Sequence, residues 1–74
     1  MNNKSSIKPG KYRHFKGGEY VVLYLAKHSE TLEEMVVYQA LYGKRGIWVR
    51  PASMWNEFVT HEGIETLRFT YIGD

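Results

Sequence analysis

The sequence predicts a mainly β fold: a small, strongly bent antiparallel barrel or roll of five or six strands with one short helical turn. Segments rich in β-branched and aromatic residues recur at short spacing, and glycine or proline separates them. A chain of 74 residues can enclose only one hydrophobic core. Since the sequence contains no cysteine, neither a disulfide nor a thiolate-bound zinc ion supports that core. We therefore expect a single domain over residues 10–74.

A hairpin is expected near the start of this domain. Residues 12–16 predict a first strand, and the dipeptide Gly17-Gly18 predicts a two-residue turn because both glycines can adopt positive φ. In that register Lys16 and Glu19 form a charged pair beside the turn. Residues 20–27 are dense in β-branched and aromatic side chains and predict the second strand.

The following segments are shorter. Residues 34–42 fit either a strand or a helix that begins at Ser29, and their β-branched residues favour the strand. A fourth strand is expected over 47–50, where Pro51 ends it. One helical turn is expected over 53–57. The remaining residues predict a hairpin around Glu62-Gly63 whose last strand covers 67–72.

Period-two alternation predicts two apolar faces for this sheet. One face collects aliphatic residues, namely Val21, Leu23, Leu25, Met35, Val37 and Leu41, joined by Tyr12 and His14. The other collects the tyrosines, namely Tyr20, Tyr24, Tyr38 and Tyr42, joined by Arg13 and Phe15. One face is expected to be the core. The other is expected to be covered by the last hairpin and the turn around Trp55, by a second copy in a homodimer, or by a ligand.

Charge is segregated along the chain although the net charge is only +2. Residues 1–18 carry five bases and no acid, and residues 43–50 carry three more bases. Residues 1–9 are expected to form a disordered basic tail. This start lacks the apolar stretch of a secretory signal, and no segment approaches the roughly 20 apolar residues that cross a bilayer. We therefore expect a cytoplasmic protein with no membrane association.

The chemistry of the sequence argues against most enzyme classes. There is no nucleophile elbow, no phosphate loop and no dinucleotide fingerprint, so we predict no cofactor. The three histidines lie in separate segments, which disfavours a metal site. His28 and Glu30 are expected to hydrogen-bond the backbone of their own connector. The alternative is a small hydrolase or transferase that uses this pair.

Several motifs together resemble one bacterial family. They are YRHFKG (12–17), HSET (28–31), ALYG (40–43), WVRP (48–51) and Arg68-Phe69. Their order and spacing resemble the domain of unknown function 1653, a resemblance that covers nearly the whole chain from residue 10 onward. It implies an SH3-like barrel and no established activity. Trp55 stands where the family pattern implies phenylalanine, and Leu67 where it implies proline.

The motifs also contain more polar and aromatic residues than a core needs. The candidate ligand-binding set is Arg13, His14, His28, Glu30, Tyr38, Tyr42, Trp48 and Arg50. We expect several of them to form one concave surface for a small anionic ligand or a peptide, with Arg13 or Arg50 as the anion contact. One alternative is a buried hydrogen-bond network that fixes the barrel, in which Arg50 bridges to Glu30 or to a backbone carbonyl. Another is single-stranded nucleic-acid binding, against which the low net charge argues.

Overall fold

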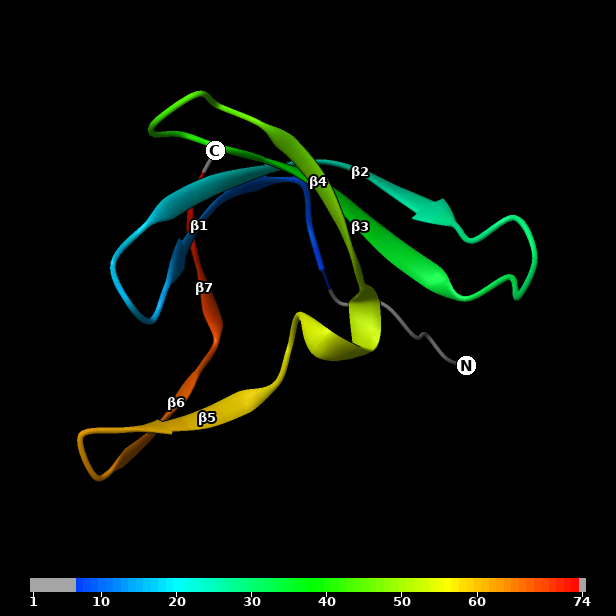
Figure 1. Ribbon diagram of the computed structural model, residues 1–74. Coiled ribbons are helices and arrows are strands. Elements are labelled where there is room, and N and C mark those ends of the chain that lie inside the picture. Colours follow the sequence, from blue (N-terminus) through cyan, green and yellow to red (C-terminus); the bar gives the residue numbers. More distant parts are fainter. Residues whose placement is uncertain (1–6, 74) are drawn as a thin grey trace.

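The computed structural model describes residues 7–73, which form two antiparallel sheets (Figure 1). The larger sheet has the strand order β4-β3-β2-β1-β7, and β5 pairs only with β6. The elements are β1 (Gly10–His14), β2 (Glu19–Lys27), β3 (Glu34–Ala40), β4 (Ile47–Pro51), η1 (Ala52–Met54), β5 (Phe58–His61), β6 (Ile64–Leu67) and β7 (Phe69–Gly73). The prediction of a mainly β chain with one short helical turn is confirmed. In the described part of the chain, no helix has the length and hydropathy of a membrane span.

Two of the predicted elements need comment. The segment that fitted either a strand or a helix is a strand, β3, which pairs with β2 and β4 on its two sides. The hairpin around Glu62-Gly63 is present as β5–β6, but Arg68 interrupts the strand expected over 67–72. The Arg68 N–H donates to the Glu57 carbonyl at 2.8 Å, so the chain turns there from the small sheet into the large one. Residues 7–73 therefore form seven strands rather than the five or six expected.

The hairpin between β1 and β2 differs from the two-residue turn that the glycines predicted. Residues 15–18 form the loop, with His14 N–H donating to the Gly18 carbonyl at 2.7 Å. Gly17 has φ +106°, a region that side chains rarely allow. Arg13, not Lys16, is therefore opposite Glu19. This register reverses the expected orientation of β1 and puts Tyr12 opposite Tyr20.

A second change of register occurs inside β2. Val22 is opposite Tyr38 and Tyr24 is opposite Val37, so an extra residue, Leu23, is inserted at a β-bulge. Before the bulge the alternation is the expected one. Beyond it the two faces exchange, and Tyr24 lies on the outer face with 69% of its surface exposed. The predicted division into an aliphatic and a tyrosine face is thus wrong for the far half of β2.

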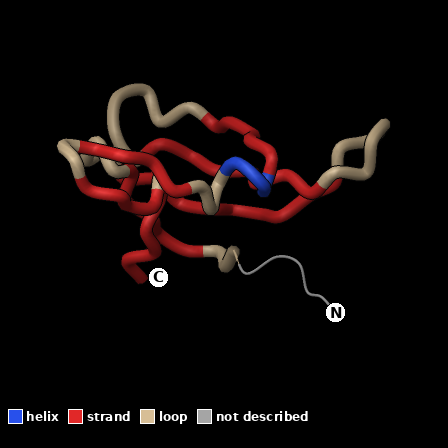
Figure 2. Tube along the Cα trace, turned by 90° about the horizontal axis from the view of Figure 1, so that it is seen from below, coloured by secondary structure: helices blue, strands red, loops and turns tan. Residues whose placement is uncertain are grey.

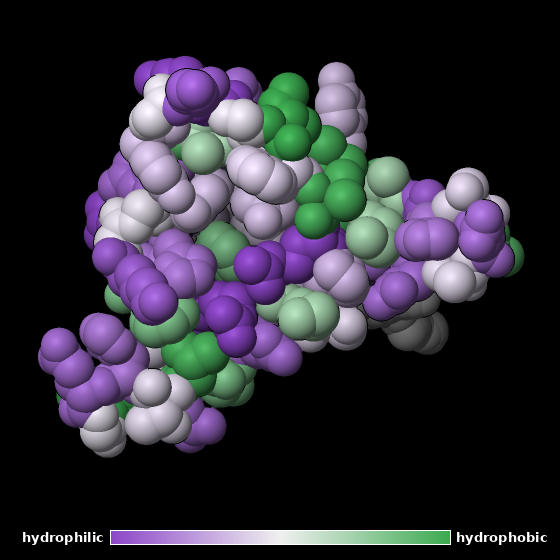
Figure 3. Space-filling model, viewed as in Figure 1, coloured by the Kyte–Doolittle hydropathy of each residue, from purple (hydrophilic) through white to green (hydrophobic). Residues whose placement is uncertain are grey.

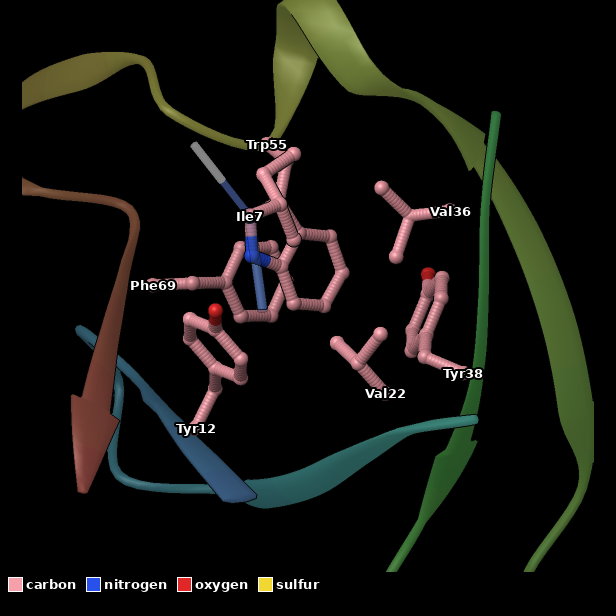
Figure 4. Close-up of a cluster of buried hydrophobic side chains, with 7 residues drawn as sticks. All are labelled: Ile7, Tyr12, Val22, Val36, Tyr38, Trp55 and Phe69. Carbon is pink, nitrogen blue, oxygen red and sulfur yellow. The ribbon is translucent and has the colours of Figure 1, made fainter. Parts of the chain in front are cut away.

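The core lies on the face that carries Tyr20 and Tyr38, and the rest of the chain covers it. Figure 4 shows its buried side chains pointing toward one another from the strands and the segment after η1. The cluster comprises Ile7, Tyr12, Val22, Val36, Tyr38, Trp55 and Phe69. Trp55 and Phe69 stack with ring centroids 3.8 Å apart and an interplanar angle of 1°. The expectation that the turn around Trp55 covers the tyrosines is confirmed for Tyr38, whose ring lies 4.9 Å from that of Trp55.

The segment before β1 belongs to this core. Ile7 is 6% exposed, and the Lys8 ammonium lies 4.4 Å from the centre of the Tyr71 ring. The expected disordered tail over residues 1–9 therefore does not hold for Ile7 and Lys8, and residues 1–6 lie outside the described part. An isolated isoleucine before a strand gave no sign of burial because its neighbours in sequence are polar.

Replacing Tyr12 by phenylalanine should loosen this segment. The Tyr12 hydroxyl accepts from Lys8 N–H at 3.0 Å and donates to the Lys8 carbonyl at 2.9 Å. Loss of both bonds leaves the ring in place and should lower the free energy of unfolding by about 1–2 kcal/mol. Urea denaturation gives this value, and Tyr24→Phe on the outer face is the matched control. Equal stability of the two variants would contradict the prediction.

Candidate functional site

An open surface of aromatic and basic side chains lies where the core reaches the solvent. We call it the aromatic–cationic surface, and its residues are His14, Tyr20, Tyr42, Trp48 and Arg50. They come from four separate segments of the chain: β1, β2, β4 and the loop that joins β3 to β4. In Figure 3, strongly hydrophilic residues gather in the middle of the visible face, between β4 and the β5–β6 hairpin.

Phe69 forms the floor of this surface and connects its members. The His14 ring lies 4.9 Å from the Phe69 ring, the Tyr20 ring lies 5.6 Å from it, and the Arg50 guanidinium carbon lies 5.5 Å from its centre. A guanidinium over an aromatic face is attracted to the negative ring face. Phe69 is only 3% exposed, so these contacts extend from the core to the surface.

Tyr20 and Tyr42 form a pair at one end of the surface. Their hydroxyl oxygens are 2.5 Å apart and share a hydrogen bond. Burial, together with the hydrogen bond to Tyr42, raises the pKa of Tyr20 to about 12, although the nearby Arg50 charge opposes the rise. The Tyr20 phenol is therefore protonated near neutral pH. Gly18 packs against both rings, because a Cβ at that position would approach Tyr42 Cε1 to 3.1 Å.

Trp48 borders the surface on β4. It is opposite the buried Tyr38, and therefore on the core side of the sheet, yet 60% of it is exposed. A Cβ on Gly46 would lie 3.1 Å from its Nε1 atom, so the indole lies along the turn that leads into β4. A large exposed indole beside a guanidinium is a common anchor in binding surfaces.

His14 lies among positive charges. Its pKa is lowered from the ordinary value, first by burial and then by the charges of Arg68, Arg50 and Lys16. Lys16 N–H donates to His14 Nδ1 at 3.1 Å, so the neutral ring carries its proton on Nε2. The ring can therefore donate one hydrogen bond without being charged. An anion placed here would be attracted by the same groups that keep His14 neutral.

This lowered pKa predicts how stability depends on pH. In the unfolded chain His14 takes up a proton near its ordinary pKa of about 6.5, while the folded chain resists protonation until a lower pH. The unfolded state therefore binds more protons in that interval, and stability falls as the pH drops through it. Urea denaturation at neutral and mildly acidic pH should show a smaller loss for His14→Gln than for the native chain. An identical loss in both would contradict the prediction.

Three of the sequence-predicted site residues lie elsewhere. Arg13 projects from the opposite face of β1 and forms an ion pair with Glu19 at 2.9 Å. His28 and Glu30 are exposed in the turn between β2 and β3, which projects from the body of the molecule in Figures 1 and 2. This turn is at the far end of the β2–β3 hairpin from Tyr42, and within residues 7–73 no ion pair joins Glu30 to Arg50.

His28 has the structural role expected of it. Its Nδ1 atom accepts hydrogen bonds from the N–H groups of Glu30 at 3.1 Å and Thr31 at 3.4 Å. The expectation that His28 binds its own connector is confirmed, whereas the Glu30 carboxylate has no such bond within residues 7–73. A histidine whose Nδ1 is used in this way is a poor general base for the proposed hydrolase alternative.

The structure adds residues that sequence reasoning left out of the site. Tyr20 was assigned only to a face of the sheet, and Arg68 and Phe69 only to a family motif. Arg68 lies near His14 and forms an ion pair with Glu57 at 3.0 Å. The Arg68-Phe69 motif was the available signal, but only the fold places β7 beside β1.

Of two cavities in the described structure, the larger lies away from this surface and the smaller shares only His14 with it. The larger, of about 470 Å³, is lined by Ile7, Lys27, Leu32, Glu33, Glu34, Ala52, Ser53 and Asn56. Its walls hold two acids, one base and no aromatic ring, so its chemistry does not suit an anion. The smaller, of about 250 Å³, lies between β1 and the β6–β7 segment. Within the described residues no group of three histidine or carboxylate side chains is arranged to hold a metal ion. We favour the aromatic–cationic surface on chemical grounds despite its openness.

Comparison with known proteins gives a consistent family assignment. The model of a family described as "Protein of unknown function (DUF1653)" matches residues 10–71. Among curated proteins none matches the chain. The structure is similar to the crystal structure of a DUF1653 protein from Bordetella bronchiseptica, with 41% identity, a TM-score of 0.85, and coverage of 92% of this chain and 90% of that one. These findings confirm the resemblance seen in the motifs, and the chain belongs to the DUF1653 family.

Proposed function

We propose that this protein is a non-enzymatic module that binds a small anionic ligand, or the acidic part of a peptide, on the aromatic–cationic surface. The observation that carries the proposal is the environment of Arg50. Its guanidinium lies over the Phe69 ring, and no acidic side chain of residues 7–73 forms an ion pair with it. A carboxylate or phosphate can therefore use hydrogen-bond donors that the fold leaves available.

The neighbouring groups support a bound anion rather than a reaction. His14 offers a neutral N–H donor, and the Tyr20 hydroxyl stays protonated near neutral pH. None of the five surface residues is a carboxylate, serine or threonine, so the surface lacks the nucleophile of the common hydrolases. Trp48 offers an exposed flat wall for the apolar part of the same ligand.

The experiment is an NMR titration that follows the two indole N–H signals. Inorganic phosphate, a glutamate-rich peptide and a single-stranded oligonucleotide are the probes. An anion on the surface should shift the Trp48 indole and leave Trp55 unchanged, because Trp48 is 60% exposed and Trp55 is 0% exposed. Binding should also raise the pKa of His14, since the anion offsets the surrounding positive charge.

Two outcomes would overturn the proposal. One is the absence of any shift at Trp48 and His14 with all three probes. The other is binding of the oligonucleotide alone, with an affinity that falls steeply as salt rises, which would replace the proposal by single-stranded nucleic-acid binding.

The SH3-like barrel and the cytoplasmic location stay parts of the proposal. The antiparallel order and the bulged, bent sheet support the first, and the absence of cysteine supports the second.

A further inference from the structure

Strand β4 forms one edge of the large sheet, and its outward backbone groups can be identified. Ala40 N–H donates to the Gly46 carbonyl at 3.1 Å, and these two residues are in register with the β3–β4 pairs. Directly opposed residues in an antiparallel pair alternate between bonded and non-bonded. The next bonded pair is therefore Tyr38 with Trp48. Ile47 and Val49 must then direct their N–H and C=O groups away from β3.

This edge has little of the protection usual for exposed strands. Ile47, Trp48 and Val49 are 60%, 60% and 61% exposed. Figure 3 shows strongly hydrophobic residues gathered over β4 along the upper border of the visible face. Natural sheets usually guard such an edge with charges, prolines or a covering segment. Here Pro51 closes one end, where it supplies no N–H, and the apolar part stays open.

The charged residues of β4 and of the sequence on either side of it are all positive. Between residues 35 and 56 the sequence contains Lys44, Arg45 and Arg50 and no acidic residue. All three bases flank the open part of β4, two in the turn before it and one near its end. A segment that lies along this edge is attracted if it is acidic and repelled if it is basic.

We infer that an extended acidic segment of a partner protein adds to β4 as a further antiparallel strand. The inference rests on the proposed function and names its ligand as a peptide. Backbone bonds would form with Ile47 and Val49. Side chains on the core side of the added strand would meet Trp48 and place a carboxylate at Arg50, while those on the other side would pack on the exposed Ile47 and Val49.

A second copy of this chain fits the edge less well. Two-fold pairing of β4 with its copy would bring both sets of Lys44, Arg45 and Arg50 to one interface without an acidic counterpart. Like charges placed together in an interface oppose association. Within residues 7–73 the acidic residues lie instead at the start of β2, in and just after the β2–β3 turn, and around the β5–β6 hairpin.

Selection from a displayed library of random peptides tests the inference. The native chain should enrich sequences that alternate acidic with apolar residues. Alternate backbone N–H groups of an added strand point toward β4 or away from it. Methylating the nitrogens that point toward β4 should lower the affinity of a selected peptide at least about tenfold, and methylating the other set should change it little. Val49→Pro removes one outward N–H and should weaken the peptide by a similar factor, whereas Val49→Thr retains the N–H and should not.

Other results would exclude strand addition. Strand addition is overturned if the selection enriches no sequence or enriches basic sequences. It is also overturned if the affinity of a selected peptide is unchanged by both N-methylation patterns and by Val49→Pro. A stable dimer by light scattering that Val49→Pro dissociates, or selective binding of the oligonucleotide, would overturn it as well. The proposed function fails separately. The Val49→Pro variant should still bind phosphate at Arg50, because Arg50 is unchanged in it. If the native chain does not bind phosphate, that result counts against the anion site and not against strand addition at β4. A folded spectrum of Val49→Pro is required for each comparison.

Discussion

Replacing Trp55 by alanine is expected to remove most of the free energy that holds the protein folded. Trp55 is 0% exposed, stacks on Phe69 at 3.8 Å and contacts the rings of Tyr12 and Tyr38 at 5.4 and 4.9 Å. Truncating a buried tryptophan costs about 3–5 kcal/mol, because the lost contacts leave a cavity. Small domains have a total stability at the low end of about 5–15 kcal/mol. Urea denaturation followed by circular dichroism measures the loss.

Two tryptophan controls make this test specific. Trp48→Ala makes the same substitution at an exposed site and should cost less than about 1 kcal/mol. Trp55→Phe should cost much less than alanine. Phenylalanine retains a ring and removes the buried Trp55 Nε1 donor, which has no hydrogen-bond partner within residues 7–73. A Trp55→Ala protein as stable as Trp48→Ala would contradict the central place that we assign to Trp55.

Replacing Arg50 by glutamine is expected to remove most anion binding while the fold persists. A hydrogen bond to a charged group contributes about 1.5–3 kcal/mol, so the affinity for phosphate or an acidic peptide should fall about tenfold to a hundredfold. The side chain is at the edge of the sheet and its charge has no ion-pair partner in the described structure, so thermal stability should change little. Phosphate titration followed at the Trp48 indole measures the effect.

Arg13→Gln is the matched control for this charge. It removes the same charge from the opposite face of the sheet, where Arg13 and Glu19 form an exposed ion pair. Exposed pairs contribute little, so both stability and anion affinity should stay near the native values. If Arg13→Gln and Arg50→Gln weakened binding equally, the effect would come from net charge alone, and the aromatic–cationic surface would not be the site.

Most strands could be predicted from local sequence. The β-branched and aromatic residues of β2 and β3 and the proline that ends β4 produce signals within a few residues, and the structure follows them. The expected orientation of the candidate site residues was found where the strand register is regular. Trp48 and Arg50 both project from the core side of β4, since they are two residues apart and pair with Tyr38 and Val36.

The errors arose where one residue decided the orientation of many. A four-residue loop in place of the Gly17-Gly18 turn put His14, rather than Arg13, on the same face of the sheet as Tyr20. The bulge at Leu23 exposed Tyr24. The turn residues are compatible with both the two-residue turn and the four-residue loop. The packing of Tyr12 against Trp55 and Tyr71 selects the second. No local pattern carries that information.

Local sequence is enough to indicate a one-core β protein with the DUF1653 motifs and the residue types of the proposed anion site, because strand formation depends on neighbouring side chains. The fold is needed to bring His14, Tyr20 and Arg50 around Phe69, and it leaves Arg13 on the opposite face and His28 and Glu30 in the β2–β3 turn. The physical reason is the period of two in a strand: a shift of one residue reverses a whole face, and contacts between distant segments fix that shift.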